Sequence, residues 1–266
     1  MSPASTEQFL LEQYTGHPAS QLQDLRKALY QSVFGCGHLI TDTSAAAEGI
    51  RREAAEAGPC SREIEALDGP WSRVHLGVLA DGLTPETLSR MFARSAAMPH
   101  GDADALQEKL AVLRRLIRSG ALPYSPSEAE EELDDWQKNG FPACRHSEEY
   151  RAAYRPAYRV LHCTYVRLLP LLAAIDRTLK EKSRVLLAIE GGAASGKSTL
   201  ADLLTAIYPD TALFHADDFF LRPEQRTAAR YAQPGGNLDR ERLESEILAP
   251  ISRNEVAIYR PFDCHT

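Results

Sequence analysis

One stretch constrains the fold of this chain more than any other, and it runs from residue 184 to residue 207 as RVLLAIEGGAASGKSTLADLLTAI. It opens with a continuous apolar run, Val185–Ile189, which is typical of a strand buried on both faces. Glycines and small residues follow. Then apolar residues recur at helical spacing, at Leu200, Leu203, Leu204 and Ile207. The stretch therefore predicts a buried strand, a tight turn and a helix in direct succession, which is the start of an α/β fold.

The turn fits the pattern G-x-x-x-x-G-K-[ST]. Its residues are Gly191, Gly192, Ala193, Ala194, Ser195, Gly196, Lys197, Ser198 and Thr199. Small residues let successive backbone N–H groups curl around a polyphosphate, and the following helix directs its positive end at the same anion. In such a loop Lys197 contacts the β- and γ-phosphates and Ser198 binds Mg²⁺. The turn thus predicts a site for ATP and magnesium; the alternative is a plain glycine turn between a strand and a helix.

Composition and charge exclude several classes of protein. The chain has 266 residues, 44% of them hydrophobic, and a net charge of −7, which argues against a general nucleic-acid or membrane-surface binder. No apolar run has the length of a membrane span, and the N-terminus lacks a signal-peptide pattern. The five cysteines are scattered and form no C-x-x-C pair, which favours a reducing cytoplasm and no structural zinc. The sequence leaves open whether the chain forms a homo-oligomer.

A change of pattern near residue 181 predicts two domains. Before it, helices follow helices, and after it, strand and helix alternate. We therefore expect an all-helical domain of unknown function over residues 1–181 and a P-loop domain with a partial parallel sheet of about three strands over residues 182–266. The elements predicted for the second domain are strand Val185–Glu190, helix Lys197–Tyr208, strand Thr211–Ala216, helix Asp239–Leu248 and strand Val256–Tyr259.

Local signals punctuate the predicted helices of the first domain. An apolar stripe from Leu22 to Val33 can end at Gly35, and Thr84-Pro85 can open the helix that carries Leu88 and Met91. The remaining signals are a cap at Thr43 or Ser44, a stripe from Leu106 to Ile117, a capping box over Ser125–Glu128, and a helical block from Ser147 to Lys182 that is bent or broken at Pro156 and Pro170. Residues 71–79 are ambiguous between strand and helix.

Two aspartates follow the second predicted strand. Because the carboxyl ends of parallel strands share one edge of a sheet, we expect Asp217 and Asp218 to lie beside the phosphate loop. A carboxylate there can accept the proton of an attacking hydroxyl or help to hold magnesium, and phosphoryl transfer needs both. The alternative is that the pair caps a helix or a turn.

Four motifs together resemble the uridine kinase and phosphoribulokinase family of P-loop kinases: GGAASGKST, ADDFF, GNLDRERL and AIYRPFD, all between residues 184 and 266. The resemblance implies that Asp217 activates the substrate hydroxyl and shares Mg²⁺ with Ser198. It also implies a substrate site in which Asp239 holds the ribose and Tyr259 lines the nucleoside pocket. Asp218 and, after a one-residue shift, His265 complete the substrate contacts that the resemblance suggests.

Two departures from the family keep alternatives open. Phe220 stands where uridine kinases usually have tyrosine, so pyrimidine preference is open. Family members also continue past the third strand with an arginine-bearing lid, whereas this sequence stops at Thr266. The resemblance implies an ATP- and Mg²⁺-dependent kinase that phosphorylates a hydroxyl of a nucleoside or a similar sugar-containing substrate. The alternatives are a nucleotide-sensing regulatory or scaffold protein with a truncated kinase domain, and a motor-like or signalling NTPase.

The helical half carries weaker signals. Tyrosine and arginine each recur every four residues from Tyr150 to Arg159, and two such stripes on one helix could hold an anionic ligand. A packing face with a solvated basic edge is the favoured reading, because Pro156 interrupts the register. Cys36-Gly37-His38 offers two metal ligands with nothing nearby to complete a set. We expect His146 and His162 to serve packing or hydrogen bonding.

Overall fold

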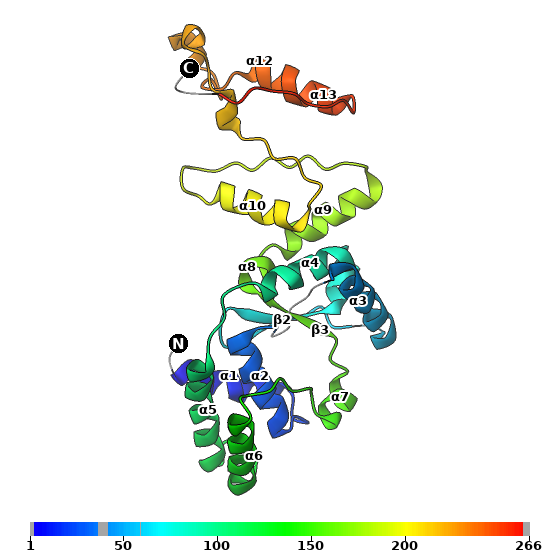
Figure 1. The fold of residues 1–266 in the computed structure, drawn as a ribbon, viewed down its shortest axis with the longest axis vertical. Coiled ribbons are helices and arrows are strands. Elements are labelled where there is room, and N and C mark those ends of the chain that lie inside the picture. The colour runs from blue at the N-terminus through cyan, green and yellow to red at the C-terminus, as the bar shows by residue number, and fades with distance from the viewer. Residues whose placement is uncertain (1–2, 37–41, 59, 263–266) are drawn as a thin grey trace. The chain divides into compact units, whose positions relative to one another are not determined.

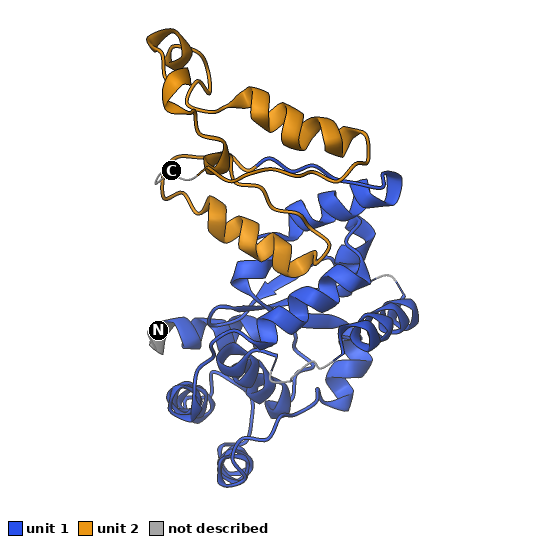
Figure 2. Cartoon of the chain, turned by 45° about the horizontal axis from the view of Figure 1, so that its top comes forward, with its two compact units in different colours: residues 1–188 blue, residues 189–266 orange. Residues whose placement is uncertain are grey.

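The structure, a computed structural model, describes residues 3–36, 42–58 and 60–262. The chain divides into two units, residues 1–188 (unit 1) and 189–266 (unit 2), which are coloured separately in Figure 2. The last helix of unit 1 ends at Glu181, at the predicted domain border, but the division itself falls after Ala188, inside the first predicted strand.

Unit 1 is mostly helical and also contains a small sheet (Figure 1). Its helices are α1 (Pro3–Gly16), α2 (Leu22–Phe34), α3 (Thr43–Ala57), α4 (Pro85–Ala96), α5 (Ala103–Arg118), α6 (Pro126–Lys138), α7 (Glu148–Tyr154), α8 (Cys163–Val166) and α9 (Leu169–Glu181), with a 3₁₀ helix η1 (Leu76–Asp81). Its strands are β1 (Ile64–Ala66), β2 (Trp71–His75) and β3 (Tyr158–His162). Helix α3 packs against α4, and α5 packs against α6.

Several helices of unit 1 begin and end where local signals predicted. Helix α2 buries Leu22, Leu25, Leu29 and Val33 and is followed by Gly35 as its C-cap. Thr84 caps α4 by accepting a hydrogen bond from the Thr87 N–H, with Pro85 in the first turn. Two cap predictions are wrong: Asp42 caps α3, and the Ser125 side chain makes no capping hydrogen bond to α6.

The sheet corrects the prediction that residues 1–181 are all helical. It is antiparallel, in the order β1-β2-β3, and pairs Glu65 with Arg73 and Tyr158 with His75. The helical block predicted from Ser147 stops at Arg155, whose φ of 44° is left-handed, and the chain then enters β3 after Pro156. Pairing with β2, far away in the sequence, therefore decides the structure of this segment. Helix α9 completes the block, with Pro170 in its first turn.

The core of unit 1 lies between its helices and the sheet. Fully buried apolar side chains come from elements distant in sequence, including Leu29 of α2, Trp71 of β2 and Leu113 of α5. No helix within the described ranges is both long and apolar enough to cross a membrane.

Unit 2 is built from one regular helix and several short ones. They are α10 (Lys197–Ile207), α11 (Ala228–Tyr231), α12 (Arg240–Leu243), the π-helical turn η4 (Glu244–Leu248), α13 (Ala249–Ser252), and the 3₁₀ turns η2 (Ala216–Phe219) and η3 (Pro223–Gln225). Helix α10 begins at the predicted residue and ends one residue early, and α12 with η4 covers the other predicted helix after its cap.

The predicted parallel sheet is not present in the described part of unit 2 and its border. Residues 184–190, 211–215 and 255–260 lie outside any strand, and Leu186, Val256 and Ile258 are 70%, 83% and 80% exposed. An isolated antiparallel bridge joins Phe220 and Leu238. Parallel strands need cover on both faces, and side chains this exposed have none. The apolar runs alone were therefore not enough to predict strand pairing, because pairing also depends on partner strands that are distant in the sequence.

Candidate nucleotide site

The glycine turn of unit 2 is open to solvent. Residues 191–196 are all exposed, and the turn leads directly into α10, whose first residue is Lys197. Gly196 has φ 88° and ψ 15°, a left-handed conformation that favours glycine. The first hydrogen bond of the helix runs from the Leu200 N–H to the Gly196 carbonyl at 2.9 Å, and no side chain caps this end. The preceding amides of the first turn are thus available to an anion.

The space beside two glycines of the turn is open. A Cβ atom added at Gly192 or Gly196 would meet nothing within 4 Å, so the backbone at these positions can be approached closely. At Gly191 the same atom would lie 2.6 Å from Ser195 Oγ, the end of a side chain that can rotate away. Of these three glycines, Gly196 has a positive φ, and its left-handed conformation is the reason that the structure gives for glycine at that position.

The lysine of the motif is folded onto the turn. Lys197 Nζ donates to the carbonyl oxygens of Gly191 and Gly192, at 2.8 Å each. The ammonium group is thereby held beside the amides that would bind a phosphate. Ser198 and Thr199 follow in the first turn of α10 and are exposed, so the Ser198 hydroxyl is accessible to a hydrated metal ion.

Asp217 and Asp218 lie in the short helix η2, and their surroundings differ. Asp217 is exposed and, among the described residues, forms no hydrogen bond or ion pair with the phosphate loop. Asp218 Oδ2 accepts a hydrogen bond from the Tyr259 hydroxyl at 3.1 Å. Burial and the neighbouring Asp218 carboxylate raise the pKa of Tyr259, so its phenol stays protonated and donates.

The aromatic ring of Phe219 joins the three motif segments that follow the phosphate loop. Phe219 is fully buried, stacks on Tyr259 with ring centroids 5.3 Å apart, and lies 5.2 Å from the Arg242 guanidinium carbon. Phe214 contacts the Tyr259 ring edge to face at 5.6 Å. The segments containing ADDFF, GNLDRERL and AIYRPFD therefore meet in space.

The carboxylate of Asp239 has protein partners on both oxygens. Asp239 is the N-cap of α12, and its Oδ1 accepts a hydrogen bond from the backbone N–H of Arg242 at 3.1 Å. Its Oδ2 accepts a hydrogen bond from Gln225 Nε2 at 3.0 Å. The side chain is 2% exposed. The structure thus gives Asp239 a capping function, whereas the resemblance implied a ribose contact. His265, the remaining predicted substrate residue, lies outside the described residues.

Three of the predicted site residues come together in the structure. Asp218, Asp239 and Tyr259 gather around Phe219, while the phosphate loop and Asp217 have no hydrogen bond or ion pair between them in the described part of the chain. Within the same residues, no three His, Cys, Asp or Glu side chains are grouped as metal ligands require. A Mg²⁺ ion at Ser198 would take most of its oxygens from phosphate and water, as this ion commonly does.

Two residues of this cluster were not singled out from the sequence. Phe219 is the hub of the aromatic group, and Arg242 holds Glu246 at 2.9 Å and donates to the Arg260 carbonyl at 2.6 Å. The signal for Phe219 was present in ADDFF, where an apolar residue directly follows two acids. Nothing in the local sequence distinguishes Arg242 from the neighbouring Arg240.

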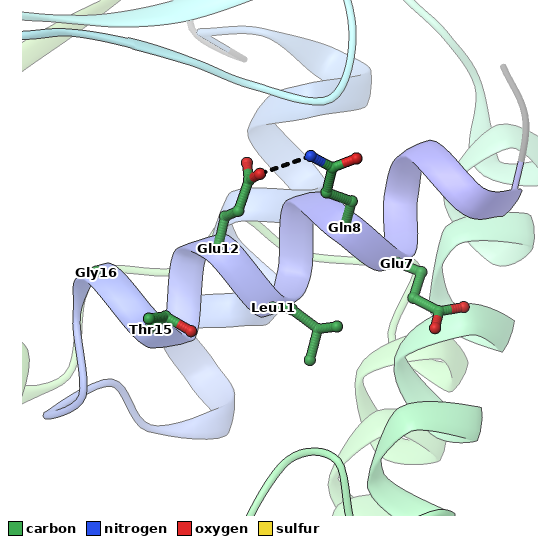
Figure 3. A pocket seen from close by; sticks show the side chains of 6 residues that line it. All are labelled: Glu7, Gln8, Leu11, Glu12, Thr15 and Gly16. Carbon is green, nitrogen blue, oxygen red and sulfur yellow. Dashed lines mark hydrogen bonds between the residues drawn. The ribbon is translucent and has the colours of Figure 1, made fainter.

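A surface pocket along α1 contains none of the predicted residues. Figure 3 shows its lining, with Gln8 bonded to Glu12 at 2.7 Å; the lining residues are Glu7, Gln8, Leu11, Glu12, Thr15 and Gly16. The carboxylates of Glu7 and Glu12 make this pocket unsuitable for a triphosphate.

Comparison of the chain with protein-family models, curated proteins and solved structures finds no match. The nucleotide site therefore rests on its own residues.

Proposed function

We propose that this chain is an ATP- and Mg²⁺-dependent small-molecule kinase of the uridine kinase type, acting in the cytoplasm. It transfers the γ-phosphate of ATP to a hydroxyl of a nucleoside or a similar sugar-containing acceptor. The observation that carries the proposal is the exposed glycine turn that opens the N-terminus of α10 with Lys197 beside it. Exposed amides at a helix N-terminus with an adjacent ammonium group are suited to a polyphosphate.

The residues of the loop would share the work of holding the triphosphate. The amides between Gly191 and Thr199 surround the β-phosphate, and Lys197 exchanges its two carbonyl partners for phosphate oxygens. Ser198 would hold Mg²⁺ beside the phosphates. The metal supplies positive charge to the phosphoryl group during transfer.

Asp217 is the base in this proposal. Its carboxylate is exposed, so it can accept the proton of an acceptor hydroxyl. We further propose that residues 184–190, 211–216 and 256–259 pair as a parallel sheet in the active enzyme. That pairing would bring Asp217 to the same edge as the phosphate loop and would cover the exposed Leu186, Val256 and Ile258.

The acceptor would bind at the aromatic group of unit 2. Tyr259 and Phe214 are half-buried rings with accessible surface, and Asp218 places a carboxylate next to the Tyr259 hydroxyl. Flat rings beside a hydrogen-bonding pair suit a base or a sugar. Asp239 supports this site by capping α12.

Phosphate transfer from MgATP to a panel of ribosides tests the proposal. The wild-type chain is expected to phosphorylate at least one riboside, and Asp217→Asn to lower turnover by about 10²–10⁴-fold while ATP affinity stays within about twofold. Asp210→Asn is the matched control, since Asp210 is another exposed aspartate of unit 2. Normal turnover in Asp217→Asn would show that Asp217 is not the base.

A nucleotide-sensing regulatory protein is the second candidate. It is favoured by the two protein partners of the Asp239 carboxylate and by the lack, among the described residues, of a hydrogen bond or ion pair between Asp217 and the phosphate loop. This candidate predicts saturable ATP binding with no phosphate transferred to any riboside in the same panel.

A further inference from the structure

The guanidinium group of Arg242 in α12 contacts three separate parts of unit 2. It lies over the ring of Phe219, with its central carbon 5.2 Å from the ring centroid. Its Nη2 donates a hydrogen bond to the Arg260 carbonyl at 2.6 Å. Its Nε and Nη2 also donate to the two carboxylate oxygens of Glu246, at 2.9 Å each. The side chain of Arg242 is 15% exposed, so these bonds are only partly screened by water.

Glu246 fixes the direction of this guanidinium. It lies four residues after Arg242, one helical turn away, and the two side chains form two parallel hydrogen bonds. The bond from Arg242 lowers the pKa of Glu246, so the carboxylate is ionised at pH 7. A bidentate pair of this kind restricts the rotation of the guanidinium, and the second hydrogen on Nη2 is thereby directed at the Arg260 carbonyl.

The contacts of Arg242 reach Tyr259 by two routes. Arg260 directly follows Tyr259, so the bond to its carbonyl restrains the backbone next to the tyrosine. Phe219, whose ring lies under the guanidinium, is fully buried and stacks on the Tyr259 ring with an interplanar angle of 21°. One arginine therefore restrains both the backbone and the ring of this tyrosine.

The hydroxyl end of Tyr259 is held separately. It donates to Asp218 Oδ2 at 3.1 Å, and the Asp218 carbonyl accepts a hydrogen bond from the Phe262 N–H at 2.9 Å. A single hydrogen bond to the phenol oxygen does not fix the plane of the ring. That plane therefore depends on the stacking with Phe219 and, through it, on Arg242.

We propose that Arg242 is a positioning residue of the acceptor site, which sets the orientation of the Tyr259 ring and thereby the affinity for the riboside. This inference rests on the proposed function, in which the half-buried rings of Tyr259 and Phe214 receive the acceptor. A ring contributes most to such a site when it lies flat against its ligand. Among the described residues, Arg242 has no hydrogen bond or ion pair with the phosphate loop, so ATP binding should not depend on it.

Steady-state kinetics of the full chain, with MgATP and the riboside that the wild type phosphorylates fastest, test this inference. Arg242→Met removes the guanidinium and keeps an unbranched side chain. It is expected to raise the KM for the riboside by about tenfold or more, while the KM for ATP stays within about twofold. Arg240→Met is the matched control and should leave both KM values unchanged, because Arg240 lies in the same helix and donates instead to Gln233 Oε1 and the Pro234 carbonyl.

A purely structural role of Arg242 would give a different result. A smaller fraction of folded protein lowers the apparent kcat and leaves both KM values unchanged. Arg242→Lys keeps the charge but cannot pair with both oxygens of Glu246 while reaching Arg260. Its riboside KM is therefore expected to rise by about threefold or more, to between those of the wild type and Arg242→Met. If Arg242→Met fails to fold, Arg242→Lys decides.

The outcomes separate this inference from the proposed function on which it rests. Absence of phosphate transfer from the wild type to any riboside would overturn both. Transfer by the wild type together with an unchanged riboside KM in the deciding Arg242 variant would overturn the inference alone. Equal rises in the KM values for riboside and ATP would also overturn it, because Arg242 would then not act on the acceptor site in particular.

Discussion

The apolar side chains of unit 1 and unit 2 have different surroundings. In unit 1, each strand of the sheet is paired, and residues such as Leu29 and Trp71 are buried by elements distant in sequence. In unit 2 and at its border, three apolar segments are extended without pairing, and Leu186 and Ile258 face solvent. Unit 1 has the more complete core, although unit 2 has the more recognisable motifs.

This difference shows that a binding motif can form from residues that are adjacent in the sequence, whereas a core needs residues that are far apart in the sequence. The phosphate loop needs only its own turn and the start of α10, which are contiguous in sequence. A parallel sheet needs strands that are separated by whole helices, with cover on both faces. A chain can therefore form the glycine turn and the helix after it without forming the parallel sheet.

Core truncation should show the largest contrast between the units. Leu29→Ala removes a fully buried side chain from α2 and is expected to lower the free energy of unfolding by about 2–5 kcal/mol. Ile258→Ala in unit 2 alters a side chain that is 80% exposed and should change the free energy of unfolding by less than about 0.5 kcal/mol. Urea denaturation measures both, and equal losses would contradict the contrast.

Mild acid should destabilise unit 1 through His146. Its pKa is about 4 in the folded chain against 6.5 for an unperturbed histidine, so the unfolded state binds more protons between these values. The stabilisation is complete above about pH 6.5 and is lost as the pH falls to about 4, by up to roughly 3 kcal/mol.

Tryptophan fluorescence can follow this loss selectively, because Trp71 and Trp136, the chain's 2 tryptophans, both lie in unit 1. The pH dependence of the urea midpoint should become smaller in His146→Gln. A pH dependence that is the same in this variant as in the wild type would rule out His146 as its source.

Helix caps should show the smallest contrast, since capping is local in both units. Thr84→Ala in α4 and Asp239→Ala before α12 are each expected to cost about 1 kcal/mol, measured as shifts of the urea midpoint. Asp239→Asn retains a capping oxygen and should be nearly neutral. A loss of riboside phosphorylation in Asp239→Asn without a loss of stability would point to the ribose contact that the resemblance implied.

The sequence predicted the parts of the fold that have local causes. The stripe of α2, the Thr84-Pro85 start of α4 and the start of α10 at Lys197 each depend on residues within one or two turns. Strand β3 was missed because the tyrosine and arginine repeats before it read as helix, whereas pairing with β2 decides its conformation. His146 was expected to serve packing or hydrogen bonding, and its stacking on Tyr150 and bond to Asp24 confirm this.

The candidate sites also differ in whether their residues are adjacent in the sequence or come from distant elements. The sequence predicted the phosphate loop because its residues are adjacent, and it singled out Asp218 and Tyr259 individually. It could not predict the buried polar contacts of unit 1, where Asp24 of α2, Arg73 of β2 and Tyr158 of β3 come together only in the folded chain. The predicted stripes on a single helix are wrong, because α7 ends at Tyr154 and Tyr158 lies in β3, although both Tyr150 and Tyr158 contact the His146 ring.

Calorimetric titration of the chain with MgATP tests the central claim most directly. The account predicts saturable binding to one site in the wild type, weakened by about tenfold or more in Lys197→Ala and unchanged in Lys182→Ala, which alters an exposed lysine outside the loop. No binding to the wild type, or equal affinity in the wild type and Lys197→Ala, would contradict the claim that the glycine turn before α10 holds a nucleoside triphosphate.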